Sequence, residues 1–358
     1  MTEISNWFYP VIPNKSKIII NNILNSGFIN EGLVSKNFEN KINKITGRKY
    51  SSVVTNGTSA ITLGLIALGV KKNDLVAVPA FSYIATINAI SIIGAKPFFI
   101  DVNVENFCIC ENDLEKKIKN KKIKYLVTVE VNGRSPNYNK LFNLSKKYNF
   151  KILTDSAESL GSKFKKKSLC NYGIISCTSF SPNKIISTGQ GGLIMTNSKK
   201  IYRKILSIKY QGHHIRGDGG SDKFFYKGFN FKLSDINSGL GISQVNLINK
   251  RLQNTENLNR IYSKYLSKFG FSFPKIQKGG KRLWCDCIVH DKEKAIKLLK
   301  RNNIGYREFW ITLNKQKPYF QKQSFKNSDF ISRHGLWLAS NFDIKPYKLE
   351  KFLKNIKV

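Results

Sequence analysis

Short apolar runs that predict strands alternate with helix-like segments along the chain from about residue 50. Each apolar run is rich in Val, Ile, Leu or Phe and is followed by turn-forming or polar residues, as is typical of buried strands. The predicted strands cover 52–55, 75–79, 97–101, 125–131, 151–154, 174–178 and 193–196, and helices are predicted at 60–68, 86–93 and 138–148. This alternation predicts an α/β domain with a mainly parallel sheet.

The pattern changes after residue 245. Residues 245–269 predict one long helix, and 270–280 are rich in turn formers. A strand at 282–289, a helix at 292–301 and a strand end at 337–340 follow. These elements predict a large domain over 1–245 and a smaller α+β domain over 246–358. Residues 1–40 form an N-terminal arm that can pack on the smaller domain.

Positive charge is spread over the whole chain. There are 60 Lys and Arg residues against 23 Asp and Glu, a formal net charge of +37. Most of the basic residues are Lys, scattered among Asn and Ile, whereas nucleic-acid recognition relies strongly on Arg. We therefore expect no nucleic-acid partner. The positive field would nevertheless attract an anionic small substrate, for example a nucleotide diphosphate.

Six cysteines occur, and four of them form two Cys-x-Cys pairs in segments that predict strands, 107–110 and 284–289. Zinc sites usually have about two to four residues between paired cysteines. We therefore expect no metal site and reduced cysteines in the core of a cytoplasmic protein. The apolar runs are too short to span a membrane, and the first residues lack the pattern of a signal peptide.

One segment carries candidate chemistry for anion binding. Asn56-Gly57-Thr58-Ser59 lies between a predicted strand and a predicted helix. Glycine allows a ligand to approach the backbone closely, and the helix start offers free N–H groups and hydroxyl donors. Gly57, Thr58 and Ser59 can therefore bind a phosphate. The same residues are also common in ordinary helix capping, so both interpretations stay open.

A carboxylate and an amine follow further along the chain. Asp155 ends a predicted strand, where it can orient a base, bind a metal or pair with a cationic ring nitrogen; Glu158 is the only further metal-ligand candidate nearby. Lys184 lies in a turn rich in Ser and Gly between two apolar strands, where an amine can be desolvated and become nucleophilic. With Tyr83 and Ser179, these residues are the parts that a pyridoxal phosphate site requires.

The motifs resemble those of the DegT/DnrJ/EryC1/StrS family of sugar aminotransferases, which are fold type I pyridoxal-phosphate enzymes. The similarity extends over about residues 17–354. It rests on the segments Thr55–Ala60, Val78–Thr86, Gly94–Val102, Asp155–Gly161, Ser179–Lys184 and Gly228–Asp235. The resemblance implies a large domain with a mainly parallel seven-stranded sheet and a smaller α+β C-terminal domain.

The resemblance also implies a role for each site residue. Lys184 and Asp155 would be the catalytic residues, the first as the Schiff-base lysine and the second as the partner of the pyridinium nitrogen. Tyr83 would stack on the cofactor ring, and Glu158 would lie near its hydroxyl group. The phosphate ligands would be Gly57, Thr58, Ser59, Ser179 and, from the neighbouring subunit, Asn230. A site shared in this way implies a homodimer.

Within the family, Ile208–Gln211, Arg307–Trp310 and Ser332–Leu338 look most like the perosamine-synthase group. That likeness implies amination of C4 of a nucleotide-linked 4-keto-6-deoxy sugar with L-glutamate as the donor, for the synthesis of a surface glycan. Arg307 and Trp310 would bind the substrate. Departures from the family pattern near the presumed sugar pocket leave the nucleotide and C3 amination open; they are Glu130–Asn132, Lys232, Asn314 and Ala339.

Two other functions are weighed against this one. A dehydratase branch of the family carries His where this chain has Lys184, so the lysine argues against deoxygenation. A non-catalytic regulatory or nucleic-acid-binding protein of the same fold would be expected to have lost Asp155 or Lys184. Both residues are present, which favours an enzyme.

Overall fold

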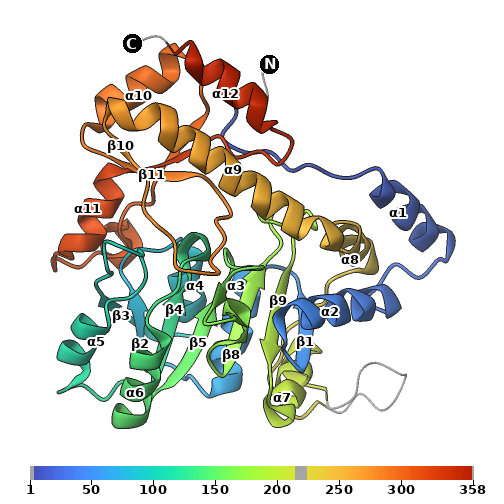
Figure 1. Ribbon diagram of the computed structural model, residues 1–358. Coiled ribbons are helices and arrows are strands. Elements are labelled where there is room, and N and C mark those ends of the chain that lie inside the picture. The colour runs from blue at the N-terminus through green and yellow to red at the C-terminus, as the bar shows by residue number, and fades with distance from the viewer. Residues whose placement is uncertain (1–3, 214–223, 357–358) are drawn as a thin grey trace.

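The computed structural model describes residues 4–213 and 224–356. A seven-stranded sheet with the strand order β1-β9-β8-β5-β4-β2-β3 forms the centre of the larger part of the molecule (Figure 1). Strand β9 is antiparallel to β1 and β8, and every other neighbouring pair is parallel. The strands are β1 (Tyr50–Val54), β2 (Leu75–Pro79), β3 (Lys96–Ile100), β4 (Tyr125–Val129), β5 (Lys151–Asp155), β8 (Ile175–Ser179) and β9 (Gly192–Thr196). The predicted mainly parallel seven-stranded sheet is confirmed.

Helices cover both faces of this sheet because successive strand residues point to opposite sides. Val76 and Val78 of β2 belong to the apolar cluster on the side of α3 (Gly57–Leu68), α4 (Ala85–Ser91) and α7 (Lys199–Lys209). Ala77 belongs to the cluster on the side of α5 (Glu111–Ile118) and α6 (Tyr138–Tyr148). Beyond β1, three helices pack together: α1 (Lys15–Asn25), α2 (Leu33–Thr46) and α8 (Asp235–Ile242).

A second, four-stranded antiparallel sheet lies in the C-terminal part, with the order β10-β11-β13-β12. Its strands are β10 (Phe271–Ser272), β11 (Asp286–Val289), β12 (Tyr306–Glu308) and β13 (Gly335–Leu338). The helices around it are α9 (Ile248–Leu266), α10 (Lys292–Arg301), α11 (Lys326–His334) and α12 (Pro346–Lys354). This part has an apolar core of its own. The boundary at residue 245 stays a prediction. A small hairpin of β6 (Lys163–Phe164) and β7 (Lys167–Ser168) belongs to the larger part.

The described start of the chain, residues 4–9, runs along the C-terminal sheet before the chain reaches α1 (Figure 1). The Ile4 carbonyl accepts the N–H of Gly305 at 2.8 Å, and the Trp7 carbonyl accepts the N–H of Ser340 at 3.0 Å. Gly305 leaves no room for a side chain, since a Cβ there would lie 2.4 Å from the carbonyl carbon of Asn6. The N-terminal arm therefore contacts the C-terminal part directly.

Two predicted strands differ from the structure. Strand β11 begins at Asp286 because the backbone N–H groups of Leu283 and Trp284 donate to Oδ1 of Asn132, at 2.9 and 3.0 Å, and have no neighbouring strand as acceptor. Residues 107–110 form no named strand, only one isolated bridge from Val102 to Ile109.

The cysteine thiols are all free, and all but one are buried. The described residues contain no group of three His, Cys, Asp or Glu side chains placed to bind a metal ion. Over 4–213 and 224–356, every helix is too short or too polar to cross a membrane.

Candidate active site

A cavity of about 620 Å³ opens at the carboxyl ends of the parallel strands, beside the N-terminus of α3. Ligands bind at this edge of an open α/β sheet because the loops after the strands diverge there. The C-terminal part closes the opposite side of the cavity. Most of the sequence-predicted site residues line the cavity: Gly57, Thr58, Ser59, Tyr83, Asp155, Glu158, Ser179, Lys184, Arg307 and Trp310.

The start of α3 forms one end of the cavity. Asn56 caps the helix, because its side-chain oxygen accepts the Ser59 N–H at 2.8 Å. The backbone N–H groups of Gly57 and Thr58 find no acceptor among the described residues. A Cβ on Gly57 would lie 2.9 Å from Cβ of Ser179. The helix start therefore offers two free N–H donors, in a place with no room for a side chain, to an anionic group.

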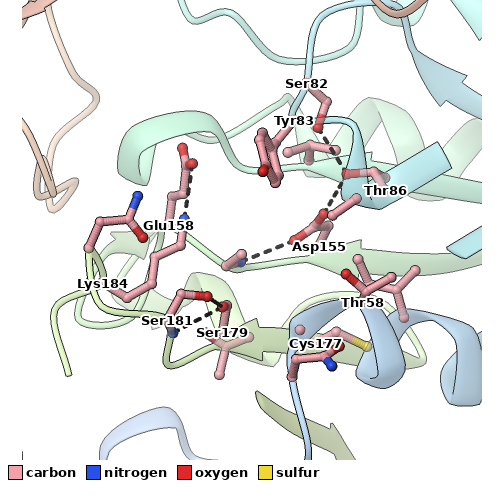
Figure 2. Close-up of a pocket in the computed structure, with 18 of the residues that line it drawn as sticks. Thr58, Ser82, Tyr83, Thr86, Asp155, Glu158, Cys177, Ser179, Ser181 and Lys184 are labelled. Carbon is pink, nitrogen blue, oxygen red and sulfur yellow. Dashed lines mark hydrogen bonds and ion pairs between the residues drawn. The ribbon is translucent and has the colours of Figure 1, made fainter. Parts of the chain in front are cut away.

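Asp155 ends β5 at the floor of the cavity. Its Oδ2 accepts the Thr86 hydroxyl at 2.8 Å, and its Oδ1 accepts the Ala157 N–H at 3.2 Å (Figure 2). Burial raises the pKa of the Asp155 carboxyl above its ordinary value, and these two hydrogen bonds lower it in part. A cation bound opposite Asp155 would favour the ionised carboxylate.

The amine of Lys184 lies beside Glu158, with Nζ 3.2 Å from Oε1 (Figure 2). Nζ is also 4.8 Å from the ring centre of Trp284, whose indole N–H donates to the Asn183 carbonyl at 3.0 Å. The other Glu158 oxygen accepts the N–H of Asn132 at 2.9 Å. A carboxylate and an aromatic ring therefore hold the amine at the cavity.

Two further predicted residues, Tyr83 and Ser179, also line the cavity. The ring of Tyr83 is half exposed and lies 6.2 Å from the ring of Trp310. The Ser179 hydroxyl contacts the Ser181 hydroxyl at 2.8 Å near the start of α3. Ser181 was not predicted, although the same Ser-x-Ser pattern that indicates Ser179 also contains it.

Asn230 is the predicted cofactor ligand that does not line the cavity of its own chain. It is exposed and pairs with Tyr210 in an isolated antiparallel bridge. A role in the cavity of a neighbouring subunit stays a prediction.

The departures from the family pattern lie outside the lining of the cavity. None of Glu130, Asn132, Lys232, Asn314 and Ala339 lines the cavity. Instead, the side chain of Asn132 binds the backbone before β11, and Asn314 donates to the carbonyls of two nearby loop residues. Asn132 nevertheless lies next to the cavity, because its N–H donates to Glu158, which lines it. The expectation that the departures lie near the sugar pocket stays a prediction.

The cavity also contains residues that sequence reasoning missed. Thr86, which donates to Asp155, lies within a matched segment but was given no role. Trp7, Trp284 and Trp337 come from segments far apart in the sequence. The only feature of the sequence that singles them out is that tryptophan is rare, since it occurs four times in this chain.

The residues present fit pyridoxal phosphate. The start of α3 supplies free N–H donors for a phosphate, Asp155 supplies a buried carboxylate for a ring nitrogen, and Lys184 supplies an amine for a carbonyl group. Fold and site together define a fold type I pyridoxal-phosphate-dependent aminotransferase.

The chain belongs to the DegT/DnrJ/EryC1/StrS aminotransferase family, whose profile matches residues 12–357. Its cofactor is pyridoxal phosphate. A protein of Escherichia coli O157:H7 named GDP-perosamine synthase is 34% identical over 261 residues, 73% of this chain and 71% of the relative. A GDP-perosamine synthase of Vibrio cholerae is 27% identical over 93% of both chains. The solved structure of Helicobacter pylori PseC has a TM-score of 0.88 and 24% identity, and covers 99% of this chain and 98% of that one. It therefore supports the fold.

Proposed function

We propose that this aminotransferase moves the amino group of L-glutamate to C4 of a nucleotide-linked 4-keto-6-deoxy sugar, as a step in the synthesis of a surface glycan. The observation that carries the proposal is one cavity with Lys184 and Asp155 at its floor and a free helix start at its end. The names of the two perosamine-synthase relatives support the choice of sugar.

The chain's own residues supply binding and proton transfer. When bound, pyridoxal phosphate acts as an electron sink that makes a neighbouring C–H bond acidic. The N–H groups of Gly57 and Thr58 would hold its phosphate, and Asp155 would keep a positive charge on its ring nitrogen. Nζ of Lys184 would move a proton from the α-carbon of the donor to the cofactor, and in the second half of the reaction from the cofactor to the sugar carbon that receives the amino group. Glu158 holds Nζ in place at 3.2 Å.

A panel of keto nucleotide sugars tests the proposal. The protein with its cofactor is incubated with L-glutamate and GDP-, UDP- or dTDP-linked 4-keto and 3-keto sugars. Mass spectrometry detects the exchange of a carbonyl oxygen for an amino group, and NMR assigns the carbon. We expect a 4-amino product together with 2-oxoglutarate. Absence of an amino sugar across the whole panel would refute the proposal.

Amination at C3 is the second candidate, and one relative favours it. The UDP-2-acetamido-2-deoxy-3-oxo-D-glucuronate aminotransferase of Pseudomonas aeruginosa is 26% identical over 287 residues. The same panel separates the two candidates, since a 3-amino product from a 3-keto sugar identifies this one. A non-catalytic protein would yield neither product. Borohydride reduction and peptide mapping test that case, because the reduced cofactor should remain attached to Lys184.

We also propose that the active unit is a homodimer in which Asn230 completes the partner's site. Asn230 is exposed and follows a series of exposed aromatic residues: Phe224, Phe225, Tyr226 and Phe229. A second set of exposed apolar side chains lies close by: Phe28, Ile29 and Leu33. Glu31 joins the two segments, because it accepts the hydroxyl of Tyr210 and the N–H of Leu233. Such apolar surface is typical of a subunit interface.

Subunit complementation tests the shared site. Inactive Lys184→Ala subunits are mixed with inactive Asn230→Trp subunits after proven exchange. If Asn230 acts in the partner's site, each mixed dimer keeps one site with both native residues. Recovery of about a quarter of the wild-type activity is expected, because about half of random dimers are mixed. No recovery would mean that Asn230 acts in its own chain or has no role.

A further inference from the structure

All four tryptophans of the chain line the active-site cavity. Trp7 comes from the N-terminal arm, and the others come from the C-terminal part: Trp284, Trp310 and Trp337. The ring centres of Trp7 and Trp284 are 5.5 Å apart, and those of Trp310 and Trp337 are 4.9 Å apart. Trp7 and Trp337 are 6.1 Å apart, so the four rings form one continuous surface, which we call the tryptophan wall.

Arg307 lies against this wall. Its guanidinium carbon is 5.0 Å from the ring centre of Trp7 and 5.7 Å from that of Trp337. A guanidinium that stacks on aromatic faces keeps its N–H donors at the edge, where they can bind a carboxylate or a phosphate. Since Arg307 also lines the cavity, a bound substrate can reach these donors.

Three buried arginines differ in their partners from Arg307, which is partly buried. Arg134 pairs with Asp286, and Arg282 pairs with Glu256. Arg251 donates to backbone carbonyls. Arg307 has neither a carboxylate nor another hydrogen-bond acceptor among residues 4–213 and 224–356. Within the described residues, the interactions of the Arg307 guanidinium are those with the ring faces of Trp7 and Trp337.

Trp7 is held firmly where it contacts Arg307. Its carbonyl accepts the Ser340 N–H at 3.0 Å, and the following Tyr9 donates its N–H to Oδ1 of Asn341 at 2.6 Å. The indole N–H of Trp7 is buried and has no acceptor within the described residues. The ring of Trp7 therefore contacts the Arg307 guanidinium with one of its aromatic faces and not through its N–H group.

We infer that Trp7 is a positioning residue that orients Arg307 to bind an anionic oxygen group of the substrate. This group is the carboxylate of the amino donor or the diphosphate of the nucleotide sugar, and both match the planar guanidinium. The inference rests on the proposed function for the identity of these two substrates. It makes the N-terminal arm part of substrate recognition.

Binding without turnover tests the inference on the cofactor-loaded protein. Glutarate is the carboxylate probe, and GDP and UDP are the diphosphate probes, each measured by isothermal titration calorimetry. Trp7→Ala should weaken the probe that binds Arg307 by about tenfold, the scale of a desolvated cation–π contact, and should leave the other probe within about twofold. Trp7→Phe keeps a ring face and should recover most of the affinity. The weakened probe identifies which substrate Arg307 binds.

Phe8→Leu is the matched control. Phe8 lies on the same arm and contacts Phe342 at 5.2 Å between ring centres, but it does not line the cavity. This variant should bind all probes as the wild type does. In turnover, Trp7→Ala should raise the KM of one substrate with little change in kcat, because the inferred role of Trp7 lies in binding through Arg307.

The inference is overturned if Trp7→Ala binds every probe within about twofold of the wild type, or if Phe8→Leu weakens binding as much. It is also overturned if no probe binds the wild type. Trp7→Leu replaces Trp7→Ala if the alanine variant does not fold, which the visible cofactor spectrum reports. Failure of all keto sugars to be aminated would refute the proposed function and leave these binding results standing.

Discussion

Replacing Glu130 with glutamine should remove one contribution to the pH dependence of this protein's stability between about pH 5 and 8. Glu130 follows β4 and is completely buried. Its carboxylate accepts the hydroxyls of Tyr138 and Ser159. Burial raises the pKa of this carboxyl from 4.5 to about 7, although the hydrogen bonds from these hydroxyls lower it in part.

The direction of the effect follows from proton binding. Between pH 4.5 and about 7 the folded chain keeps a proton on Glu130 that the unfolded chain releases. Stability therefore falls as the pH rises through this range, and it stays lowered above pH 7. One pH unit corresponds to about 1.4 kcal/mol, so the total loss of unfolding free energy is about 3 kcal/mol.

Glutamine stays neutral at every pH in this range, so the variant does not lose this unfolding free energy as the pH rises. Its amide NH₂ group, however, brings two N–H donors to a place where the protonated carboxyl has one O–H, and burying the extra donor costs about 1 kcal/mol. Glu130→Gln should therefore be slightly less stable than the wild type at pH 5. At pH 8 it should be more stable by about 2 kcal/mol.

Thermal unfolding measures the difference. Melting temperatures of the two proteins are compared from pH 5 to pH 8 at equal protein, cofactor and salt concentrations. The two curves should cross, with Glu130→Gln higher at alkaline pH by a few degrees. Glu308→Gln, at an exposed carboxyl on β12, is the control and should follow the wild type. Parallel curves for Glu130→Gln and the wild type would refute the reasoning.

Three further changes act on the cavity itself. Lys184→Ala should abolish transamination while the fold stays intact by circular dichroism, and turnover near the wild-type rate would exclude Lys184 as the proton carrier. Asp155→Asn should lower kcat about 10²- to 10⁴-fold while cofactor still binds, as absorbance shows; a loss of less than about tenfold would contradict its role. Gly57→Ala would place a Cβ 2.9 Å from Cβ of Ser179. It should weaken cofactor binding about tenfold in a titration, whereas unchanged affinity would argue against a phosphate at this position.

The large sheet could be predicted because its strands are continuous apolar runs, typical of strands buried on both faces. Strand β2 and helices α6 and α10 match their predicted bounds. Helices α5, α7, α11 and α12 are not predicted, since Lys, Asn and other polar residues occupy most of their positions. Their apolar residues bury only when the helices pack on the sheets, and that packing cannot be read from local composition.

The meeting of Gly57, Asp155 and Lys184 in one cavity could be predicted because each of them follows a strand. The carboxyl ends of parallel strands meet at one edge, so residues distant in the sequence come together there. No such rule predicts that the residues of the tryptophan wall come together. Trp7 and Trp337 meet only because the N-terminal arm runs along the C-terminal sheet, which no local pattern indicates.

Asn132, one of the departures from the family pattern, acts on the cavity through its hydrogen bonds. Its backbone has a φ of 49° and a ψ of 42°, the left-handed conformation that asparagine tolerates better than most residues. From there its N–H binds Glu158, and its side chain binds the backbone of Leu283 and Trp284. Glu158 and Trp284 are the two groups that flank the amine of Lys184. One residue outside the cavity therefore orients both neighbours of the Lys184 amine.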